Sequence, residues 1–105
     1  MKLLTDKIRE SLPALYASES KPETEQTVIC KFFTPWSNWT WYALEFDGTD
    51  TFFGLVVGFE TELGYFSLCE LEGIKGPWGL TVERDIHFDP VPLSAIRAAL
   101  WEREN

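Results

Sequence analysis

The sequence predicts an α+β domain. It has a five-stranded, mainly antiparallel sheet in the element order α-β-β-β-β-β-α, with the N- and C-terminal helices on one face. Apolar side chains recur at helical spacing near both ends of the chain, and runs rich in aromatic and β-branched residues lie between them. Most of these runs are joined by short links. With 105 residues, the chain is expected to form a single domain over residues 1–105.

The first predicted helix begins near Thr5, a residue type that caps helix N-termini, and Asp6 follows in the first turn. Pro13 limits this helix. Its apolar stripe recurs every four residues, at Leu4, Ile8 and Leu12. Residues 17–27 are polar and are predicted to form an exposed loop.

Four predicted strands follow this loop, at residues 27–34, 39–46, 51–59 and 63–69. Residues 47–50, which include Gly48, are typical of a tight hairpin turn. Because a parallel crossover needs a dozen or more residues, links this short require neighbouring strands to run antiparallel, as in a meander.

Side-chain alternation assigns faces within two of these strands. In 39–46, one face carries Trp39, Trp41 and Ala43 and continues to Glu45. In 51–59, Gly54 and Gly58 share a face and leave room for a neighbouring ring or for a bulge.

The rest of the chain is predicted to hold a short helical turn at 70–74, a fifth strand at 83–88, and a helix that begins at Pro92 or Ser94. Glycine and proline around Trp78 predict a connecting loop pinned by that side chain. The fifth strand alternates, with Arg84, Ile86 and Phe88 on one face. The last helix has an apolar face made by Leu93, Ile96, Leu100 and Trp101.

Negative charge is concentrated in the middle of the chain. The net charge is −8, and residues 45–89 hold ten acidic and two basic side chains, while both flanking segments are neutral. Such a field repels nucleic-acid phosphates and anionic membranes and attracts basic protein surfaces. We therefore expect a protein partner with a basic surface, no direct nucleic-acid binding and no membrane association. The same charge also favours solubility.

The two cysteines are expected to be free thiols. No segment approaches the ~20 apolar residues that span a bilayer, and the charged N-terminus does not resemble a secretory signal. A cytoplasmic location follows as an expectation, and thiols stay reduced there. Their apolar neighbours predict that Cys30 and Cys69 are small buried core residues rather than a redox pair or metal ligands.

Few residues are suited to catalysis. The chain has one histidine and neither a Gly-x-Ser-x-Gly motif nor a phosphate-binding P-loop. His87 shares a predicted strand face with Glu83, Asp85 and Asp89, and such a group can coordinate a divalent cation. Side chains at i and i+2 lie about 7 Å apart, so a second strand would have to complete the site. We assign no catalytic, cofactor or metal residue, and a small metal-binding or hydrolytic domain centred on His87 remains an alternative.

The candidate partner-binding residues combine carboxylates with two tryptophans. Trp and Tyr dominate binding at protein interfaces, although these rings would belong to the core if the helices covered their face. A nucleic-acid stacking platform would need basic residues nearby, and only Lys31 is near in sequence. The residues assigned to partner binding are Glu45, Asp47, Asp50, Glu60, Glu62, Glu70, Glu72, Trp39 and Trp41.

Several motifs are shared with a known family. The most distinctive is Asn38-Trp39-Thr40-Trp41-Tyr42, and others lie at 4–5, 12–13, 31–35, 45–48, 52–56, 62–67, 70–71 and 83–85. With these motifs the chain resembles, over nearly its full length, small bacterial proteins classified as a domain of unknown function and often encoded on plasmids and integrative elements. The resemblance implies an accessory role on a mobile element and brings no established activity, cofactor or catalytic residue.

These observations favour a non-enzymatic protein-interaction module with an acidic face. In its most specific form it is a DNA-mimicking inhibitor of a host nucleic-acid-binding or defence complex, since separated carboxylate clusters can present a row of negative charge to a basic groove. A second alternative is a homodimeric structural accessory protein, joined through an open sheet edge or the aromatic face. Either a monomer or a homodimer is compatible with the sequence.

Overall fold

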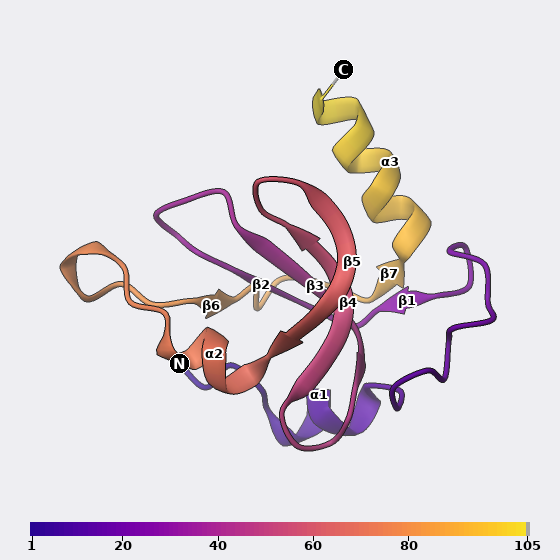
Figure 1. Cartoon of the computed structure of the whole chain (residues 1–105), viewed down its shortest axis with the longest axis horizontal. Coiled ribbons are helices and arrows are strands. Elements are labelled where there is room, and N and C mark those ends of the chain that lie inside the picture. The colour runs from indigo at the N-terminus through magenta and orange to yellow at the C-terminus, as the bar shows by residue number, and fades with distance from the viewer. Residues whose placement is uncertain (105) are drawn as a thin grey trace.

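The computed structural model describes residues 1–104 and contains a five-stranded antiparallel sheet with helices near both ends of the chain (Figure 1). The sheet order is β5-β4-β3-β2-β6, and β1 pairs separately with β7. The predicted α+β class is confirmed. The elements are α1 (Asp6–Ser11), β1 (Thr27–Val28), β2 (Cys30–Phe33), β3 (Thr40–Phe46), β4 (Thr51–Val57), β5 (Thr61–Ser67), α2 (Leu68–Gly73), η1 (Pro77–Gly79), β6 (Glu83–Arg84), β7 (Val91–Pro92) and α3 (Leu93–Glu104).

The meander prediction is correct for β2 to β5 and wrong for the fifth strand. β6 lies on the edge opposite β5, where Glu83 and Arg84 pair with β2. The chain can reach that edge because a long segment containing α2 and η1, rather than a tight turn, separates β5 from β6. β6 is also shorter than predicted. The chain turns after Arg84, with the Phe88 N–H donating to the carbonyl of Asp85 and the His87 N–H donating to its carboxylate.

A β-bulge in β3 reverses the faces of its last residues. The pairing of β3 with β4 shifts between Ala43 and Glu45, so that Glu45 lies opposite Phe53 and Phe46 lies opposite Phe52. Directly opposed residues share a face, and Phe46 packs in the same cluster as Ala43. Glu45 therefore points to the other face. The prediction that Glu45 continues the tryptophan face is wrong, because one extra residue in a strand inverts the alternation beyond it.

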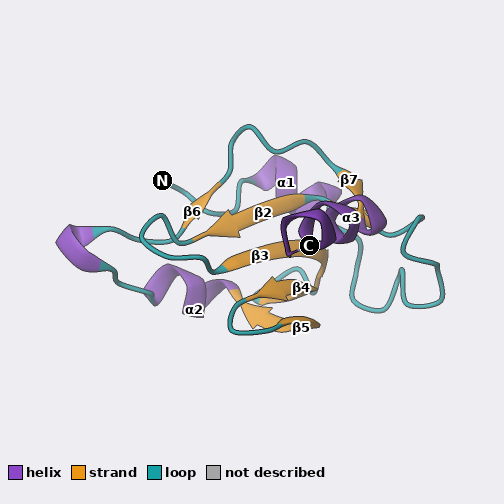
Figure 2. Ribbon diagram, turned by 90° about the horizontal axis from the view of Figure 1, so that it is seen from above, coloured by secondary structure: helices purple, strands orange, loops and turns teal. Residues whose placement is uncertain are grey.

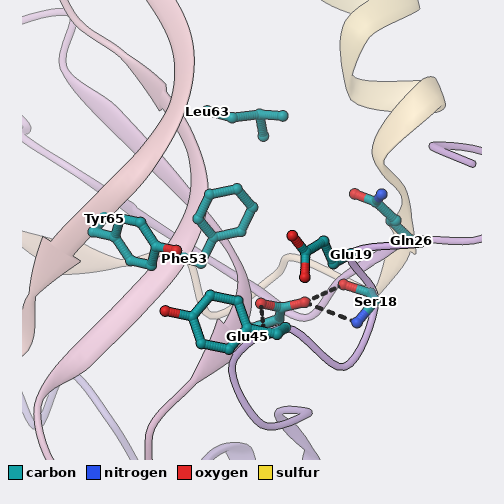
Figure 3. A pocket seen from close by; sticks show the side chains of 8 residues that line it. Ser18, Glu19, Gln26, Glu45, Phe53, Leu63 and Tyr65 are labelled. Atoms are coloured by element: carbon teal, nitrogen blue, oxygen red, sulfur yellow. Dashed lines mark hydrogen bonds between the residues drawn. The ribbon is translucent and has the colours of Figure 1, made fainter. Parts of the chain in front are cut away.

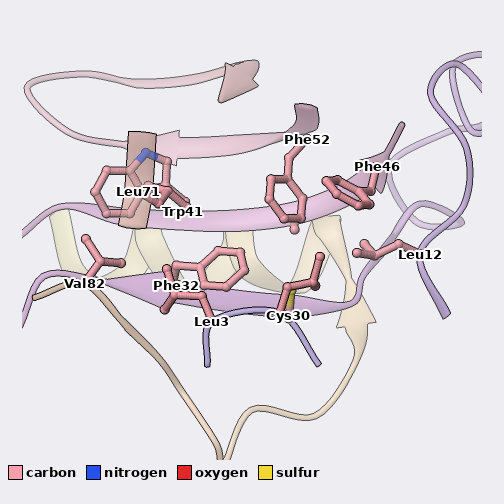
Figure 4. Packing of buried hydrophobic residues seen from close by; sticks show 11 residues of the cluster. Leu3, Leu12, Cys30, Phe32, Trp41, Phe46, Phe52, Leu71 and Val82 are labelled. Carbon is pink, nitrogen blue, oxygen red and sulfur yellow. The ribbon is translucent and has the colours of Figure 1, made fainter. Parts of the chain in front are cut away.

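Each face of the sheet buries its own hydrophobic cluster, because β3 is apolar on both sides. The first cluster lies beneath the N-terminal segment, α1 and α2, and includes Leu3, Leu12, Phe32, Trp41, Phe46, Phe52 and Leu71 (Figure 4). The second lies beneath α3 and includes Val28, Tyr42, Leu44, Leu55 and Leu93. The helices near the two ends of the chain thus cover opposite faces, and the prediction that they share one is wrong (Figure 2).

The two cysteines differ in environment. Cys30 is buried in the first cluster, as predicted. Burial raises the pKa of its thiol to about 12, against a smaller opposing effect of the Arg84 charge. Cys69 is exposed, so its predicted place in the core is wrong. It follows Ser67, the N-cap of α2, and therefore lies on a helix rather than in a strand.

We expect one thiol per chain to react rapidly in the native protein. The thiolate is the attacking species; Cys69 is exposed to the reagent, whereas burial both shields Cys30 and suppresses its ionisation. Titration with a coloured disulfide reagent near neutral pH should count one thiol, and both thiols should react in denaturant. A Cys69→Ser variant that keeps the fast reaction would contradict this assignment.

Two glycines that face each other across β4 and β5 give a matched test of the packing. A Cβ at Gly54 would lie 1.9 Å from the carbonyl oxygen of Tyr42, whereas a Cβ at Gly64 would meet no atom within 4 Å. We expect Gly54→Ala to lower the free energy of unfolding by about 1–3 kcal/mol, because backbone must move. Gly64→Ala should change it by less than ~1 kcal/mol. Thermal unfolding would compare them, and equal midpoints for the two variants would argue against this register.

Candidate functional site

Two of the predicted partner-binding carboxylates are engaged within the fold. One oxygen of Asp47 accepts backbone N–H groups from residues 49–51 at 2.8, 2.8 and 3.1 Å, and these bonds lower the pKa of Asp47 from its ordinary value. Asp50 accepts the Ser67 hydroxyl at 2.6 Å and the Cys69 N–H at 2.8 Å. Asp47 thus holds the β3–β4 turn, and Asp50 holds the start of α2.

Four of the five remaining acidic candidates lie in two separate patches, and the fifth, Glu45, is buried. Glu60 lies in the β4–β5 turn and Glu62 near the start of β5, whereas Glu70 and Glu72 lie on α2, which follows the other end of β5 (Figure 1). All four are exposed, and none forms an ion pair within residues 1–104. Antiparallel strands place consecutive turns at opposite ends of a sheet. The acidic middle of the chain therefore does not form one continuous face.

Four aromatic residues lie on segments at the end of the sheet where Glu60 lies. The strand ends Thr61, Val57, Thr40, Phe33 and Glu83 are successive partners across the sheet, so the three segments beyond them lie at the same end. These segments are the β2–β3 loop, the β4–β5 turn and the segment that precedes β6. We call their aromatic set the aromatic end: Trp36, Trp39, Phe59 and Trp78.

Phe59 is the most exposed ring of the aromatic end, at 96% of its surface. Its ring meets Trp39 edge-on, with centroids 5.4 Å apart, and Trp39 stacks on Trp41 at 5.9 Å. Trp41 is only 7% exposed and belongs to the first cluster, so of the two predicted tryptophans only Trp39 reaches the surface. A Cβ at Gly58 would lie 2.3 Å from the Trp39 ring, which confirms that this glycine leaves room for a ring.

Trp78 is the second ring of the aromatic end that is almost fully in solvent, at 93% exposure. It lies at the tip of a tight turn in which the Gly76 N–H donates to the Leu80 carbonyl at 2.7 Å. Its φ of 55° lies in the left-handed region, which large side chains rarely adopt. The prediction that Trp78 pins this loop is wrong. Trp36 packs there instead, since a Cβ at Gly76 would lie 2.5 Å from its ring.

Glu45 is buried, at 3% exposure, and does not belong to the outer acidic surface. One of its carboxylate oxygens accepts the Tyr16 N–H at 2.8 Å, and the other accepts the Ser18 N–H at 2.9 Å and the Ser18 hydroxyl. Tyr16 has a φ of 70°, in the left-handed region. The buried carboxylate therefore fixes the loop that follows α1 in a conformation that a tyrosine does not favour by itself.

A cavity of about 230 Å³ adjoins this carboxylate, between the loop after α1 and the surface of β4 and β5. Figure 3 shows Phe53 and Tyr65 on the strand side, with the Glu19 and Glu45 carboxylates facing the same space. The Phe53 and Tyr65 ring centroids are 5.1 Å apart. Among residues 1–104, no Lys or Arg lines this cavity. We refer to it as the Glu45 pocket, after the residue that shapes it.

Tyr65, which lines the Glu45 pocket, has a raised pKa. A hydrogen bond with the Tyr16 hydroxyl, followed by burial and the charges of Glu19 and Glu45, raises the pKa of Tyr65 above its ordinary value. Sequence reasoning missed this pocket, because residues 17–27 carry no motif and lie far from Glu45 in the chain. The one available signal is an acidic residue between Leu44 and Phe46 in an otherwise apolar strand.

The carboxylates near His87 do not converge. The strand face that would have aligned them is not formed, and Asp85 lies in a turn with Lys31 3.8 Å from its carboxylate. His87 and Asp89 are exposed. No group of three or more His, Cys, Asp or Glu within residues 1–104 is placed to hold a metal ion. Within residues 1–104, no helix is long and apolar enough to cross a bilayer.

We expect Glu45→Gln to lower the free energy of unfolding by about 1–3 kcal/mol, because an amide presents one acceptor oxygen where the carboxylate serves three donors. Glu62→Gln is the matched control and should stay within ~0.5 kcal/mol of the wild type. Chemical unfolding measures both values, and hydrogen exchange at the Tyr16 and Ser18 amides should speed up only in Glu45→Gln. Equal stability of the two variants would show that the buried carboxylate does not hold the loop.

Comparison with known families gives one match, which covers residues 3–101 and is described as "Protein of unknown function (DUF2958)". Neither the curated proteins nor the solved structures contain a match to the chain. The matched range includes every strand of the sheet, the aromatic end and the Glu45 pocket. The chain therefore belongs to the DUF2958 family of proteins of unknown function.

Proposed function

We propose that this protein is a non-enzymatic interaction module that binds a protein partner through its aromatic end. The observation that carries the proposal is the exposure of two large rings, Phe59 and Trp78, on loops at the same end of the sheet. Aromatic anchors of this kind supply most of the binding energy at protein interfaces. Trp36 and Trp39 are half-buried: Trp39 contacts Phe59, and Trp36 packs against the turn that carries Trp78.

Charge gives this surface a preference among partners. Glu60 and Glu62 lie beside Phe59 and have no ion pair within residues 1–104. Unpaired carboxylates at the rim of an aromatic patch attract a basic partner and accelerate its association. The protein as a whole carries a net charge of −8, which opposes the alternative of a nucleic-acid stacking platform.

The more specific form of the proposal is that the partner is a nucleic-acid-handling protein of the host, whose basic groove the protein occupies as a DNA mimic. It is supported by the charge and by the family resemblance, which implies an accessory role on a mobile element, and it includes a cytoplasmic location. In this mechanism Asp47 and Asp50 add to the negative electrostatic field but do not contact the partner directly, because their carboxylates already accept hydrogen bonds from the fold.

Affinity capture from the cells that encode the protein tests the proposal with three variants. Phe59→Ser with Trp78→Gly should lower the affinity of the captured partner about 30-fold or more, because it removes both exposed anchors. Glycine suits the left-handed backbone at position 78. Glu60→Gln with Glu62→Gln should lower affinity several-fold at low salt and little at high salt.

The matched control is Glu70→Gln with Glu72→Gln, which removes the same charge from α2 and should leave the affinity almost unchanged. A partner retained equally by all variants would rule out the aromatic end as its binding site. Competition with duplex DNA addresses the specific form. A partner that the wild type binds equally well with and without excess duplex would exclude DNA mimicry and leave the interaction intact.

A further inference from the structure

The Glu45 pocket lies on the α3 face of the sheet and is separate from the aromatic end, since Glu45, Phe53 and Tyr65 are directly opposed partners across β3, β4 and β5. From its lining we propose that it binds an alkylammonium group, carried by a small amine or by a lysine side chain. This inference is independent of the proposed function, because it uses a different face of the sheet and none of the four rings of the aromatic end.

The walls of the pocket are aromatic. Tyr16, Phe53 and Tyr65 line it, and Leu63 completes the apolar part. The Phe53 and Tyr65 rings are tilted by 57° to each other, and both line the cavity. The electron-rich face of an aromatic ring attracts a cation within about 6 Å of its centre, and sets of such rings recognise substituted ammonium groups. The alkyl part of the ligand packs on the same surfaces.

Two carboxylates make the pocket selective for positive charge. Glu19 is exposed at its mouth, and its carboxylate forms no hydrogen bond or ion pair within residues 1–104. Glu45 lies at its inner wall. A carboxylate has about four acceptor positions, and the loop uses three of those on Glu45. The remaining position is on the oxygen that accepts the Tyr16 N–H, and it can accept an N–H from a ligand.

The size of the cavity limits the ligand. A water molecule occupies about 30 Å³ of liquid, so a cavity of about 230 Å³ holds a group of only a few heavy atoms. Pockets for drug-sized ligands begin at roughly 300 Å³. One short alkyl chain with its ammonium group fits, whereas a nucleotide or a folded peptide does not. The electronegative lining and the absence of Lys or Arg from it, within residues 1–104, exclude an anionic group.

The test is a titration of the full chain with n-butylammonium, followed by the backbone amide signals of Tyr16, Ser18 and Phe53 in NMR spectra. We expect saturable shifts at these residues, with a dissociation constant of about 1–10 mM. Neutral n-butanol has the same shape without the charge and should bind at least tenfold more weakly. Equal binding of n-butanol, or shifts that do not saturate or lie elsewhere, would overturn the proposal.

Two further variants test the site without changing Glu45, whose carboxylate the fold itself needs. Glu19→Gln removes an exposed charge at the mouth and should weaken n-butylammonium binding about tenfold, whereas Glu62→Gln, on the other face of β5, should leave it unchanged. If Glu19→Gln and Glu62→Gln weakened n-butylammonium binding equally, the binding would reflect only general electrostatic attraction to an acidic protein. That result would overturn the proposal. A lysine whose α-amino and α-carboxyl groups are both blocked distinguishes a lysine side chain from a small free amine as the ligand. Binding at least tenfold tighter than n-butylammonium indicates a lysine side chain, and equal or weaker binding indicates a free amine.

Discussion

The β-bulge between Ala43 and Glu45 is the constraint on which both faces of the molecule depend. Without it, Phe46 would leave the first cluster and Glu45 would be driven into that cluster as a charge among apolar side chains, which is a costly arrangement. With it, the Phe46 ring packs against the Phe52 ring, with centroids 4.4 Å apart, and the Glu45 carboxylate reaches the loop after α1. A single extra residue thus separates the position that builds the core from the position that shapes the pocket.

The parts of the fold that the sequence predicts are those set by neighbouring residues. The cap at Thr5, the turn at Gly48 and the hairpins from β2 to β5 depend on local chemistry, and all are present. The place of β6 beside β2 depends on contacts between residues about fifty apart, and no local pattern encodes it. The bulge is equally hidden, because its effect is visible only in the register of β4. Two face assignments are wrong: that of Glu45, and that of the helices near the two ends of the chain. Both depend on how segments of the chain pair and pack, not on the local pattern.

Charge counted along the chain proved a weak guide to surface chemistry, for a physical reason. Asp47, Asp50 and Glu45 are acidic in composition, yet each accepts hydrogen bonds that a turn, a helix start or a loop would otherwise lack. A carboxylate oxygen is the strongest acceptor a side chain offers to backbone N–H groups. The middle of the chain is therefore acidic partly because its turns need acceptors. Exposed carboxylates that accept no such bonds within residues 1–104, such as Glu60 and Glu62, are fully available to a partner.

The edge strand β5 links the two proposed surfaces. Its alternation places Glu62 on the same face as Trp41, since both pair with Val56, and places Leu63 and Tyr65 on the face of the Glu45 pocket. Both surfaces favour positively charged groups, by carboxylates at their rims and rings at their bases. The edge between them carries a charged residue and a glycine, Glu62 and Gly64, which disfavour pairing with another strand. A basic partner that reached around β5 would meet one site on each side of this edge. Because the edge resists strand addition, contacts to side chains rather than backbone pairing would determine which partner binds.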